Sequence, residues 1–536
     1  MRILSFKPGH DGAIASIANE QLEFSLEAEK DSFPRYFAVT PNVLLSAFHL
    51  TPAFPDIVCI SGWERGIHAM GRPLEAAHSG HDLSADLLRS IEAGYYGHDL
   101  SGCKVNTQNL FGKKTAYFTS THERSHLLGA YGMSPFPQGQ PCYALVWEGH
   151  VGSFYLIDEN VKVHHLGQAL EDPGTKYSFL FSVADPSFPE GKGYFRFGDA
   201  GKLMALAAFS DRTAPTDGEK QIIDFILSRR SIIRSTSKVE LKDTYLFNAG
   251  VESNSFKSLA GKFSDAIFDR FYSFARQHLK EGFPLLISGG CGLNCEWNTK
   301  WLDSGLFQDV FVPPCANDSG SAIGTAVDAQ LYFEGKAKIS WSVYAGLDFV
   351  LDTNEAPGFK AEPLNYQEVA DFIKADNVIA WVQGRYEIGP RALGNRSLLA
   401  NPLNEQMLDR LNRIKQRESY RPIAPVCLEE DLVHFTGQTK PSPYMLFFHK
   451  LTTPALPAVT HVDNSARFQT VNDRENPPLR KLLTAFKQLT GYGVLCNTSL
   501  NFRGQGFINR LSDLVDYAKD VGLDGFVVGN TFFRKI

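Results

Sequence analysis

The sequence lacks the cysteine pattern of a secreted, disulfide-stabilised protein. Its eight cysteines are spread along 536 residues without a C-x-x-C pair, and such cysteines in a long chain are expected to be reduced. No apolar run reaches about 18 residues, so no membrane-spanning helix is expected. The chain starts with an apolar strand at 2–6 instead of the apolar core of a signal peptide. These absences predict a cytoplasmic protein without a membrane partner.

The chain also lacks an excess of positive charge. Lysine and arginine number 53 against 59 aspartates and glutamates, a net charge of −6, so no nucleic-acid partner is expected. Hydrophobic residues make up 43% and charged residues 21%, which is typical of a globular protein. Since 536 residues are too many for one core, and the pattern loosens between 335 and 365, we predict two domains, 1–345 and 360–536.

Strands and helices alternate in both domains, which predicts an α/β fold. A strand–turn–strand–turn–strand pattern with a glycine-rich first turn occurs at 2–26 and again at 142–165. It is similar to the opening of actin-like ATPases, where the turn holds phosphate, and its repetition predicts two related lobes. Helical periodicity predicts first-domain helices near 200–210, 218–229 and 256–280. The second domain is predicted to contain strands at 377–382, 423–428 and 493–496 and helices at 404–415 and 477–489.

Two histidines one helical turn apart, His122 and His126, are the most informative feature of the chain. Residues i and i+4 share a helix face, so both imidazoles can face one spot and bind a divalent metal. Ser120 or Thr121 is placed to cap the helix start. Two alternatives remain open. Such a pair is often a surface pair, and the run also matches the H-E-x-x-H pattern of zinc proteases, with Glu123 as the base.

Asp318 lies just before a predicted helix, in the run N-D-S-G. Its carboxylate could cap that helix, which is the commoner role of such a residue. It could instead join the two histidines in a two-histidine, one-carboxylate metal site. That ligand set suits Fe(II), Mn or Zn with open positions for substrate.

Two glycine-rich turns are candidates for phosphate or nucleotide binding. The turn 9–12 contains His10 and Asp11, and its backbone N–H groups can approach a phosphate. His10 titrates near the working pH, which suits proton transfer; the alternative is an ordinary turn with local hydrogen bonds. The run S-G-G-C-G-L-N at 288–294 either passes close to a nucleotide or packs a strand against a helix.

The second domain holds the densest charge pattern. Residues 385–421 contain eight lysines and arginines against four acidic residues, on turns rich in glycine and proline. Arginines held on such turns predict a pocket for a polyanion, although a basic surface is the alternative. Tyr386 and Tyr420 are the only aromatics there that could stack on bases, so ATP or a small phosphorylated substrate fits better than RNA. The run C-N-T-S-L-N-F-R at 496–503 is either a nucleotide pocket or a polar loop.

Taken together, these motifs cover nearly the whole chain in order. They are K-P-G-H-D-G-A (7–13), E-K-D-S-F-P-R (29–35), H-E-R-S-H (122–126), V-W-E-G-H-V-G (146–152), G-K-L-M-A-L-A (201–207), S-G-G-C-G-L-N-C (288–295), V-P-P-C-A-N-D-S-G-S-A-I-G (312–324), G-R-Y-E-I-G-P-R-A-L-G-N-R-S (384–397), Y-R-P-I-A-P (420–425), H-V-D (461–463), A-R-F-Q-T (466–470) and N-T-S-L-N (497–501). The chain therefore resembles the O-carbamoyltransferases of antibiotic biosynthesis, which include tobramycin-, cephamycin- and nodulation-type carbamoyltransferases.

The resemblance implies an actin-like (ASKHA) two-lobed domain followed by a YrdC-like α/β domain. It implies Fe(II) bound by His122, His126, Asp318 and, from the V-W-E-G run, Glu148. In the first domain it places ATP or carbamoyl adenylate near Lys7, Asp11, Gly12, Gly149, Lys202, Gly289, Gly290 and Asn294. In the second domain it places carbamoyl phosphate and ATP, with Mg, near Arg385, Arg391, Arg396, Lys415, Arg421, Arg467, Asn497, Ser499 and Arg503.

The implied reaction turns carbamoyl phosphate and ATP into carbamoyl adenylate in the second domain. The carbamoyl group then passes to a hydroxyl-bearing natural-product acceptor in the first domain, where our hypothesis makes His10 the general base. The sequence departs from the family at Glu148, where an aspartate is common, and after Asn501, where R-G-E-P-I-V is replaced by R-G-Q-G-F-I. A homodimer is left open.

Three other functions are weighed against this one. A tRNA-modification factor of the threonylcarbamoyl type would share both domain types, but the net charge of −6 speaks against it. A metalloprotease would leave the arginine-rich second domain without a purpose. A small-molecule kinase would release ADP, whereas the complete adenylation reaction releases pyrophosphate when carbamoyl adenylate forms and AMP when the carbamoyl group is transferred.

Overall fold

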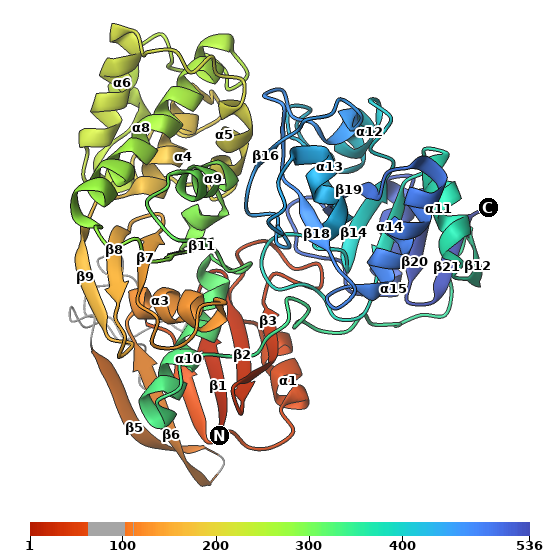
Figure 1. Ribbon diagram of the computed structural model, residues 1–536, viewed down its shortest axis with the longest axis horizontal. Helices are drawn as coiled ribbons and strands as arrows, with labels where there is room; N and C mark the ends of the chain where they lie inside the picture. Colours follow the sequence, from red (N-terminus) through yellow and green to blue (C-terminus); the bar gives the residue numbers. More distant parts are fainter. Residues whose placement is uncertain (63–101, 111) are drawn as a thin grey trace.

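The computed structural model describes residues 1–62, 102–110 and 112–536. Figure 1 shows two parts: a first domain of two stacked lobes on the left and a second domain on the right. The connection 335–358 leads from the last helix of the first domain to the first strand of the second. Both parts combine helices with sheets, so the predicted α/β class is confirmed.

The first lobe is built on a sheet with the strand order β3-β2-β1-β4-β6-β5. β1, β2 and β3 form an antiparallel meander, while β4 and then β6 continue the sheet parallel to β1. Its strands are β1 (Arg2–Lys7), β2 (Ala13–Ala18), β3 (Gln21–Glu27), β4 (Ile57–Ile60), β5 (Cys103–Leu110) and β6 (Lys113–Ser120). The helices beside it are α1 (Pro41–Leu50), α3 (His122–Met133) and α10 (Ser321–Glu334).

The second lobe repeats this topology in the order β9-β8-β7-β10-β11. β7, β8 and β9 form the antiparallel meander, and β10 and β11 continue parallel to β7. The predicted repetition, and with it the actin-like arrangement, is confirmed. The strands are β7 (Cys142–Trp147), β8 (Gly152–Ile157), β9 (Val163–Gln168), β10 (Leu285–Ser288) and β11 (Val310–Phe311). The helices are α4 (Pro173–Ala184), α5 (Asp199–Ala207), α6 (Asp217–Ser228), α7 (Ile232–Ser235), α8 (Asn254–His278) and α9 (Cys295–Asp303).

Helices α3 and α10 lie between the two sheets and join the lobes (Figure 1). α3 packs on α10 and on β7 and β10, while α10 packs on β1, β2 and β4. The two helices approach very closely at Gly324, where an added Cβ would lie 1.7 Å from the carbonyl oxygen of Ser125. Glycine is therefore required at this crossing, because any side chain would push the helices apart.

The second domain is organised around a mixed sheet with the order β12-β21-β20-β13-β14-β19-β15-β18. β20 and β13 pair in parallel, as do β15 and β18, and the remaining neighbours are antiparallel. Its strands are β12 (Phe359–Pro363), β13 (Ile379–Val382), β14 (Arg396–Ala400), β15 (Ala424–Leu428), β18 (Gln469–Val471), β19 (Val494–Ser499), β20 (Gly525–Val528) and β21 (Thr531–Lys535), with a separate pair β16 (His449–Lys450) and β17 (Ser465–Ala466). The helices are α11 (Tyr366–Lys374), α12 (Met407–Ile414), α13 (Leu432–Thr436), α14 (Pro477–Thr490) and α15 (Leu511–Asp520).

A segment of the first lobe, residues 30–36, ties the two domains together. The backbone N–H groups of Ser32 and Arg35 donate to the carbonyls of Phe507 and Gly504, at 2.9 and 3.2 Å. Arg510 pairs with Asp31 at 2.6 Å. A second set of contacts joins α9 to residues 445–448, including the Asn298 amide donating to the Leu446 carbonyl at 2.9 Å. These backbone contacts fix the domains against each other.

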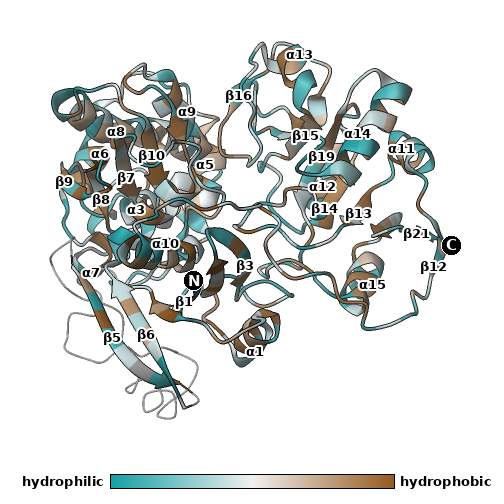
Figure 2. Ribbon diagram, turned by 60° about the horizontal axis from the view of Figure 1, so that its bottom comes forward, coloured by the Kyte–Doolittle hydropathy of each residue, from teal (hydrophilic) through white to brown (hydrophobic). Residues whose placement is uncertain are grey.

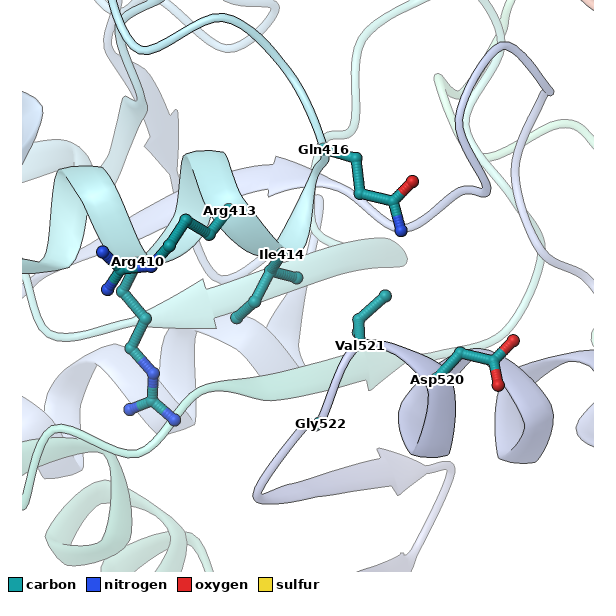
Figure 3. Close-up of a pocket in the computed structure, with 7 residues that line it drawn as sticks. All are labelled: Arg410, Arg413, Ile414, Gln416, Asp520, Val521 and Gly522. Carbon is teal, nitrogen blue, oxygen red and sulfur yellow. The ribbon is translucent and has the colours of Figure 1, made fainter.

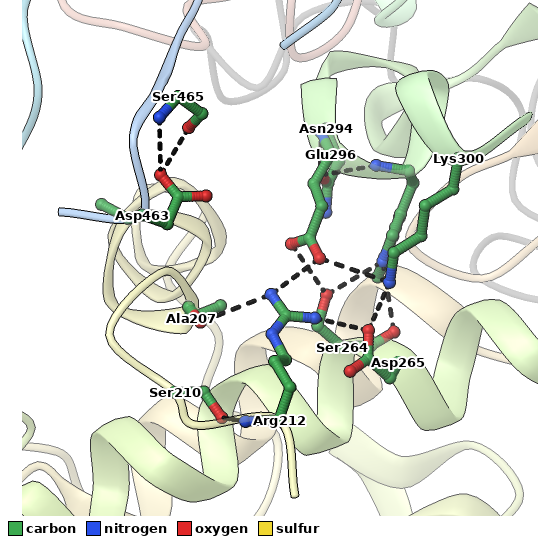
Figure 4. Close-up of polar contacts among 12 residues, drawn as sticks. Ala207, Ser210, Arg212, Ser264, Asp265, Asn294, Glu296, Lys300, Asp463 and Ser465 are labelled. Carbon is green, nitrogen blue, oxygen red and sulfur yellow. Dashed lines mark hydrogen bonds and ion pairs between the residues drawn. The ribbon is translucent and has the colours of Figure 1, made fainter. Parts of the chain in front are cut away.

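A charged network holds α9 against α8 (Figure 4). Glu296 on α9 accepts from Arg212 at 2.7 Å and Lys300 at 3.3 Å, and both cations also pair with Asp265 on α8. The next residue, Trp297, stacks on Trp147 at the end of β7, with ring centroids 4.6 Å apart. The network therefore holds the end of β7 in place, and Glu148 follows directly after this strand.

Apolar side chains gather on the sheets, as the brown β7 and β10 in Figure 2 show. Leu145, Leu285 and Ile287 on these strands are fully buried in the core of the second lobe. The eight cysteines, all within the described residues, are unpaired. Among the described residues, no helix combines the length and the apolar character needed to cross a bilayer.

The α3–α10 crossing generates a prediction about stability. Replacing Gly324 with alanine should destabilise the protein by about 1–3 kcal/mol, because the new methyl group meets a backbone carbonyl that cannot turn away. Thermal unfolding followed by circular dichroism would measure the loss. The matched control is Gly201→Ala on α5, where an added Cβ meets no atom within 4 Å, so stability should stay equal or rise. Equal unfolding temperatures for the two variants would contradict the proposed role of the crossing.

Candidate metal centre and the neighbouring cation cluster

The N-terminus of α3 places two imidazoles side by side between the lobes. The Thr121 hydroxyl accepts from the backbone N–H of Arg124 at 3.2 Å and caps the helix. His122 and His126 then stand one turn apart, both buried, with ring centroids 4.7 Å apart. The histidine pair is therefore not on the surface.

Four donor side chains, which we call the metal cluster, converge at this point. One ligand atom each from His122, His126, Glu148 and Asp318 lie within 4.8 Å of one another. The two Glu148 oxygens lie 2.8 Å from Nε2 of His122 and 2.8 Å from Nε2 of His126. Oδ1 of Asp318 lies 3.5 Å from Nε2 of His126. Two imidazoles and two carboxylates form a donor set that fits Fe(II), Mn(II) or Zn(II).

Glu148 is held in place by the turn after β10. Gly289 has a φ of +97°, and an added Cβ there would lie 2.4 Å from the Trp147 carbonyl oxygen and 2.6 Å from Cγ of Glu148. A side chain at this position would displace the carboxylate from the imidazoles. With this turn in place, the Glu148 carboxylate reaches both histidines.

Asp318 opens a short helical turn, Asp318–Gly320, and its side chain makes no capping hydrogen bond. The alternative that it caps the following helix is therefore wrong. Its Oδ2 lies 3.0 Å from Nζ of the buried Lys7, while Oδ1 faces the histidines. Burial raises the pKa of Asp318, but Lys7, His122 and His10 outweigh it and hold that pKa well below the ordinary value.

Ser288 orients the second imidazole. Nδ1 of His126 lies 3.0 Å from the Ser288 hydroxyl, which itself donates to the Ala316 carbonyl at 3.4 Å. The hydroxyl therefore accepts from Nδ1–H, and this contact directs Nε2 toward the carboxylates. This arrangement is typical of the residues that support metal ligands.

The electrostatics of the cluster favour a cation. Burial lowers the pKa of His126, but Glu148 and Asp318 raise it to about 10. Burial raises the pKa of Glu148, yet His126 and His122 lower it to about 2 despite the nearby Asp318. Two buried carboxylates thus stay ionised and attract positive charge to the point between the imidazoles.

His10 lies at the edge of this cluster, with its side chain 45% exposed and Nε2 3.7 Å from Oδ2 of Asp318. Its Nδ1 lies 3.1 Å from Oδ2 of Asp11, whose other oxygen accepts from the Asn317 amide at 3.0 Å. Burial lowers the pKa of His10, but Asp318 and Asp11 raise it above its usual value. The ring of Phe197 lies 5.5 Å from the imidazole.

Of the other first-domain residues predicted to contact a nucleotide, some border open space and others are used in packing or in capping a helix. Gly290 borders open space, since an added Cβ would meet no atom within 4 Å, and Gly149 meets only the Thr175 methyl. In contrast, a Cβ at Gly12 would lie 2.4 Å from the backbone nitrogen of Val39, so its role is packing. The side-chain oxygen of Asn294 accepts from the backbone N–H groups of Glu296 and Trp297 and caps α9.

Lys202, at the start of α5, faces the second domain. Its Nζ lies 3.2 Å from Asp199 and 3.8 Å from Glu418. This side chain therefore spans the two domains instead of lying beside the metal cluster.

A cluster of cations gathers where the second domain meets the first. We call Arg35, Arg391, Lys415, Arg417, Arg421 and Arg467 the cation cluster. Burial and the neighbouring Arg467 lower the pKa of Arg391 to about 9. Burial, Arg421 and Arg467 likewise lower the pKa of Arg417 to about 9. Cations held this close destabilise one another, and a bound polyanion would relieve the repulsion.

The cluster meets the first domain at Arg391, whose guanidinium donates to the carbonyl of Leu293 at 3.0 Å. Lys415 donates to the Ser499 carbonyl at 2.5 Å and to the Asn501 side chain at 2.6 Å. Within the described residues, the buried Nε atoms of Arg391 and Arg467 make no hydrogen bond. These two guanidinium groups retain donors for an anion.

Two predicted arginines lie outside the cluster. Arg396 is fully buried and donates to the Asn509 side chain and to four backbone carbonyls. Arg385 donates to the carbonyls of Gly346, Glu23 and Ala345. Because backbone carbonyls occupy them, both guanidinium groups stabilise the chain near the domain junction.

The residues predicted to bind substrate at the end of β19 and in the turn after it have different surroundings. The Asn497 amide donates to Gln469 at 2.8 Å, and the Ser499 hydroxyl donates to Asn501 at 2.6 Å. Arg503 lies exposed in the following turn. Ser499 therefore stands beside Lys415 and the cluster, whereas Arg503 faces solvent.

Sequence reasoning missed Arg35 and Arg417 as members of the cluster. Arg417 lies in the basic run and could have been included on that ground. Arg35 is an isolated arginine some 350 positions earlier in the chain, so no local pattern connects it with the second domain. Its charge lowers the pKa of Arg391, Lys415 and Arg421, while Asp11 is among the acidic groups that raise its own. Arg35 is therefore the member of the cation cluster that comes from the first lobe, and it interacts with Asp11 as well as with the other cations.

A separate hollow of about 370 Å³ opens between α12 and the end of α15 (Figure 3). Its lining residues are Arg410, Arg413, Ile414, Gln416, Asp520, Val521 and Gly522. None of these belongs to either cluster.

Comparison with known proteins identifies the family of the chain. The family model described as Carbamoyltransferase N-terminus matches residues 2–327, and the one described as Carbamoyltransferase C-terminus matches residues 370–535. The 3'-hydroxymethylcephem-O-carbamoyltransferase of Amycolatopsis lactamdurans is 47% identical, over 100% of this chain and 99% of that protein. Nodulation protein U of Rhizobium tropici is 33% identical, over 95% of this chain and 92% of that protein.

Among solved structures, full-length HypF in its phosphate- and nucleotide-bound form is 14% identical with a TM-score of 0.32, covering 64% of this chain and 56% of that chain. The assignment rests on the sequence relatives, which match along the entire chain. Both halves match the two parts of one family, in the expected order. This chain belongs to the carbamoyltransferase family.

Proposed function

We propose that this protein is an ATP-dependent O-carbamoyltransferase with two reaction sites. Beside the cation cluster, carbamoyl phosphate is hydrolysed to carbamate and phosphate, and a carbamate oxygen then bonds to the α-phosphorus of ATP to give carbamoyl adenylate and pyrophosphate. The carbamoyl group then passes to an acceptor hydroxyl at the metal cluster. The observation that carries the proposal is the convergence of His122, His126, Glu148 and Asp318 on one point next to the turn that holds His10.

We propose a hydroxymethyl group on a cephem-type ring as the acceptor. Relatives named for carbamoyl transfer to 3'-hydroxymethylcephem are 47% identical over the full length of this chain, in two organisms. The nodulation protein U relatives are more distant, at 33% and 31% identity over 95% and 100% of the chain. The higher identity favours a cephem alcohol over a nodulation-factor sugar.

The residues around the metal cluster suit the transfer step. The acceptor oxygen forms a bond to the carbamoyl carbon, the bond from that carbon to the adenylate oxygen breaks, and AMP leaves. His10 takes the proton of the hydroxyl as general base, with Asp11 and Asp318 holding its ring. A bound Fe(II), held by the four donors, supplies Lewis-acid polarisation of the carbamoyl group.

The cation cluster suits the activation step. Arg391, Lys415 and Arg421 bring positive charge to bear on the phosphates of ATP, which also carry Mg. Glu418, 3.7 Å from Arg421, offsets only part of this charge. We place the path of the intermediate past Arg35, because this residue interacts with Asp11 on one side and with Arg391 on the other. Tight domain contacts along residues 30–36 keep water away from the reactive adenylate.

Removing one imidazole should separate the two steps. We expect His126→Ala to lose stoichiometric iron and to lower carbamoyl transfer by about 10²-fold or more. Release of pyrophosphate from ATP in the presence of carbamoyl phosphate should persist, because the cation cluster is untouched. Metal analysis and product chromatography measure both. The matched control is His164→Ala, which removes an exposed histidine paired with Asp158 at 2.7 Å. Full iron content in His126→Ala would rule out the metal site.

Neutralising the cation cluster should block activation. Arg421→Ala is expected to lower pyrophosphate release by about 10²-fold and to leave iron content unchanged. In the unaltered enzyme the nucleotide product should be AMP, and ADP would instead indicate a kinase. The control is Arg534→Ala, an exposed arginine on β21 at the opposite side of the sheet. Unchanged pyrophosphate release in Arg421→Ala would remove the cluster from the mechanism.

The proposed base is tested by His10→Ala. We expect carbamoyl transfer to fall by about 10²–10⁴-fold, while iron binding and pyrophosphate release stay as in the unaltered enzyme. Rapid-quench measurement of a single turnover isolates the transfer step. If transfer is intact in a variant that still binds iron, His10 is not the base.

A further inference from the structure

Aromatic side chains lie exposed beside His10. Phe197, 46% exposed, stands 5.5 Å from the imidazole and 4.8 Å from the ring of Tyr36, centroid to centroid. Phe195 meets Phe197 edge-on at 4.7 Å. Single exposed aromatics are ordinary, but Phe197 packs both against a solvent-accessible imidazole and against two further rings, so these side chains form one apolar surface beside His10.

The chain holds this surface rigidly. Arg196, between the two phenylalanines, pairs with Asp185 at 2.8 Å and donates to the Ser187 carbonyl at 2.8 Å. The N–H of Gly193 donates to the carbonyl of Ile233 at 2.8 Å. The segment before α5 is thus anchored to the second lobe by its polar groups, while Phe197 turns toward His10.

Tyr36 is fixed from the other side. Its φ is +63°, a conformation that aromatic residues rarely adopt, and its backbone N–H donates to Glu29 at 3.2 Å. The Tyr36 carbonyl accepts from the backbone N–H of Asp11 at 3.4 Å. The ring of Tyr36 therefore belongs to the same rigid unit as the turn that carries His10.

We propose that Phe197 and Tyr36 form the acceptor subsite, which takes an alcohol carried on a rigid ring system. The inference rests on the proposed function, since it assumes that the acceptor hydroxyl approaches His10. A ring system that packs on Phe197 presents a hydroxymethyl substituent to the adjacent imidazole. Rigid aromatic faces hold rigid ring ligands with little loss of conformational freedom. Phe197 is a positioning residue that determines which alcohols are carbamoylated.

The test measures acceptor binding apart from turnover. Binding of a 3-hydroxymethylcephem alcohol to the iron-loaded protein, without ATP, is followed by calorimetry. We expect Phe197→Ala and Phe197→Leu to weaken binding by about tenfold and Phe197→Tyr to restore it. In turnover assays the same variants should raise the KM for the acceptor and leave the KM values for ATP and carbamoyl phosphate unchanged. An acyclic primary alcohol should be affected little, because it has no ring to stack.

The matched control is Phe48→Ala on α1, a phenylalanine of similar exposure, 44%, in the first lobe; it should bind the acceptor normally. Equal acceptor binding by the Phe197 variants and the unaltered protein overturns the inference. So does failure of the unaltered protein to bind the cephem alcohol. If that protein binds the alcohol in a Phe197-dependent manner but never carbamoylates it, the subsite stands and the proposed function fails.

Discussion

The metal cluster depends on the close crossing of α3 and α10. α3 carries both histidines, and the turn that leads into α10 carries Asp318. At Gly324 the helices approach until an added Cβ would lie 1.7 Å from a backbone oxygen. Because the same two helices join the lobes, the crossing also determines where Glu148, from the second lobe, meets the imidazoles. Backbone packing thus determines the donor geometry, and the side chains supply its chemistry.

The molecule buries two groups of charged side chains of opposite sign, the carboxylates of the metal cluster and the cations of the cation cluster. The carboxylates of Glu148 and Asp318 stay ionised between the lobes and attract a cation, while the cation cluster of the second domain attracts a polyanion. Each is unfavourable alone in a low-dielectric interior. The contacts of residues 30–36 hold the domains together, and Arg35 from this segment joins the cations of the second domain.

Much of the architecture could be predicted from local pattern. The repeated meander of strands, the histidine pair and the helices near 200, 218 and 256 follow from hydrophobic periodicity and turn chemistry, and the structure has them there. The basic run of the second domain indicated a polyanion pocket, but not which of its arginines belong to it. Arg385 and Arg396 are occupied by backbone carbonyls, and the pattern of charges cannot distinguish an arginine that satisfies the backbone from one that faces a ligand.

The sequence by itself determined the α/β class, the spacing that puts two imidazoles on one helix face, and the presence of a run rich in arginine in the second domain. These features depend on neighbours within a few residues. Only the tertiary structure decided that Asp318 faces the histidines instead of capping a helix, that Glu148 bridges both rings, and that Arg35 joins arginines far along the chain. It also placed Phe197 against His10. These contacts join residues distant in sequence, and they arise from packing between elements, which no local pattern records.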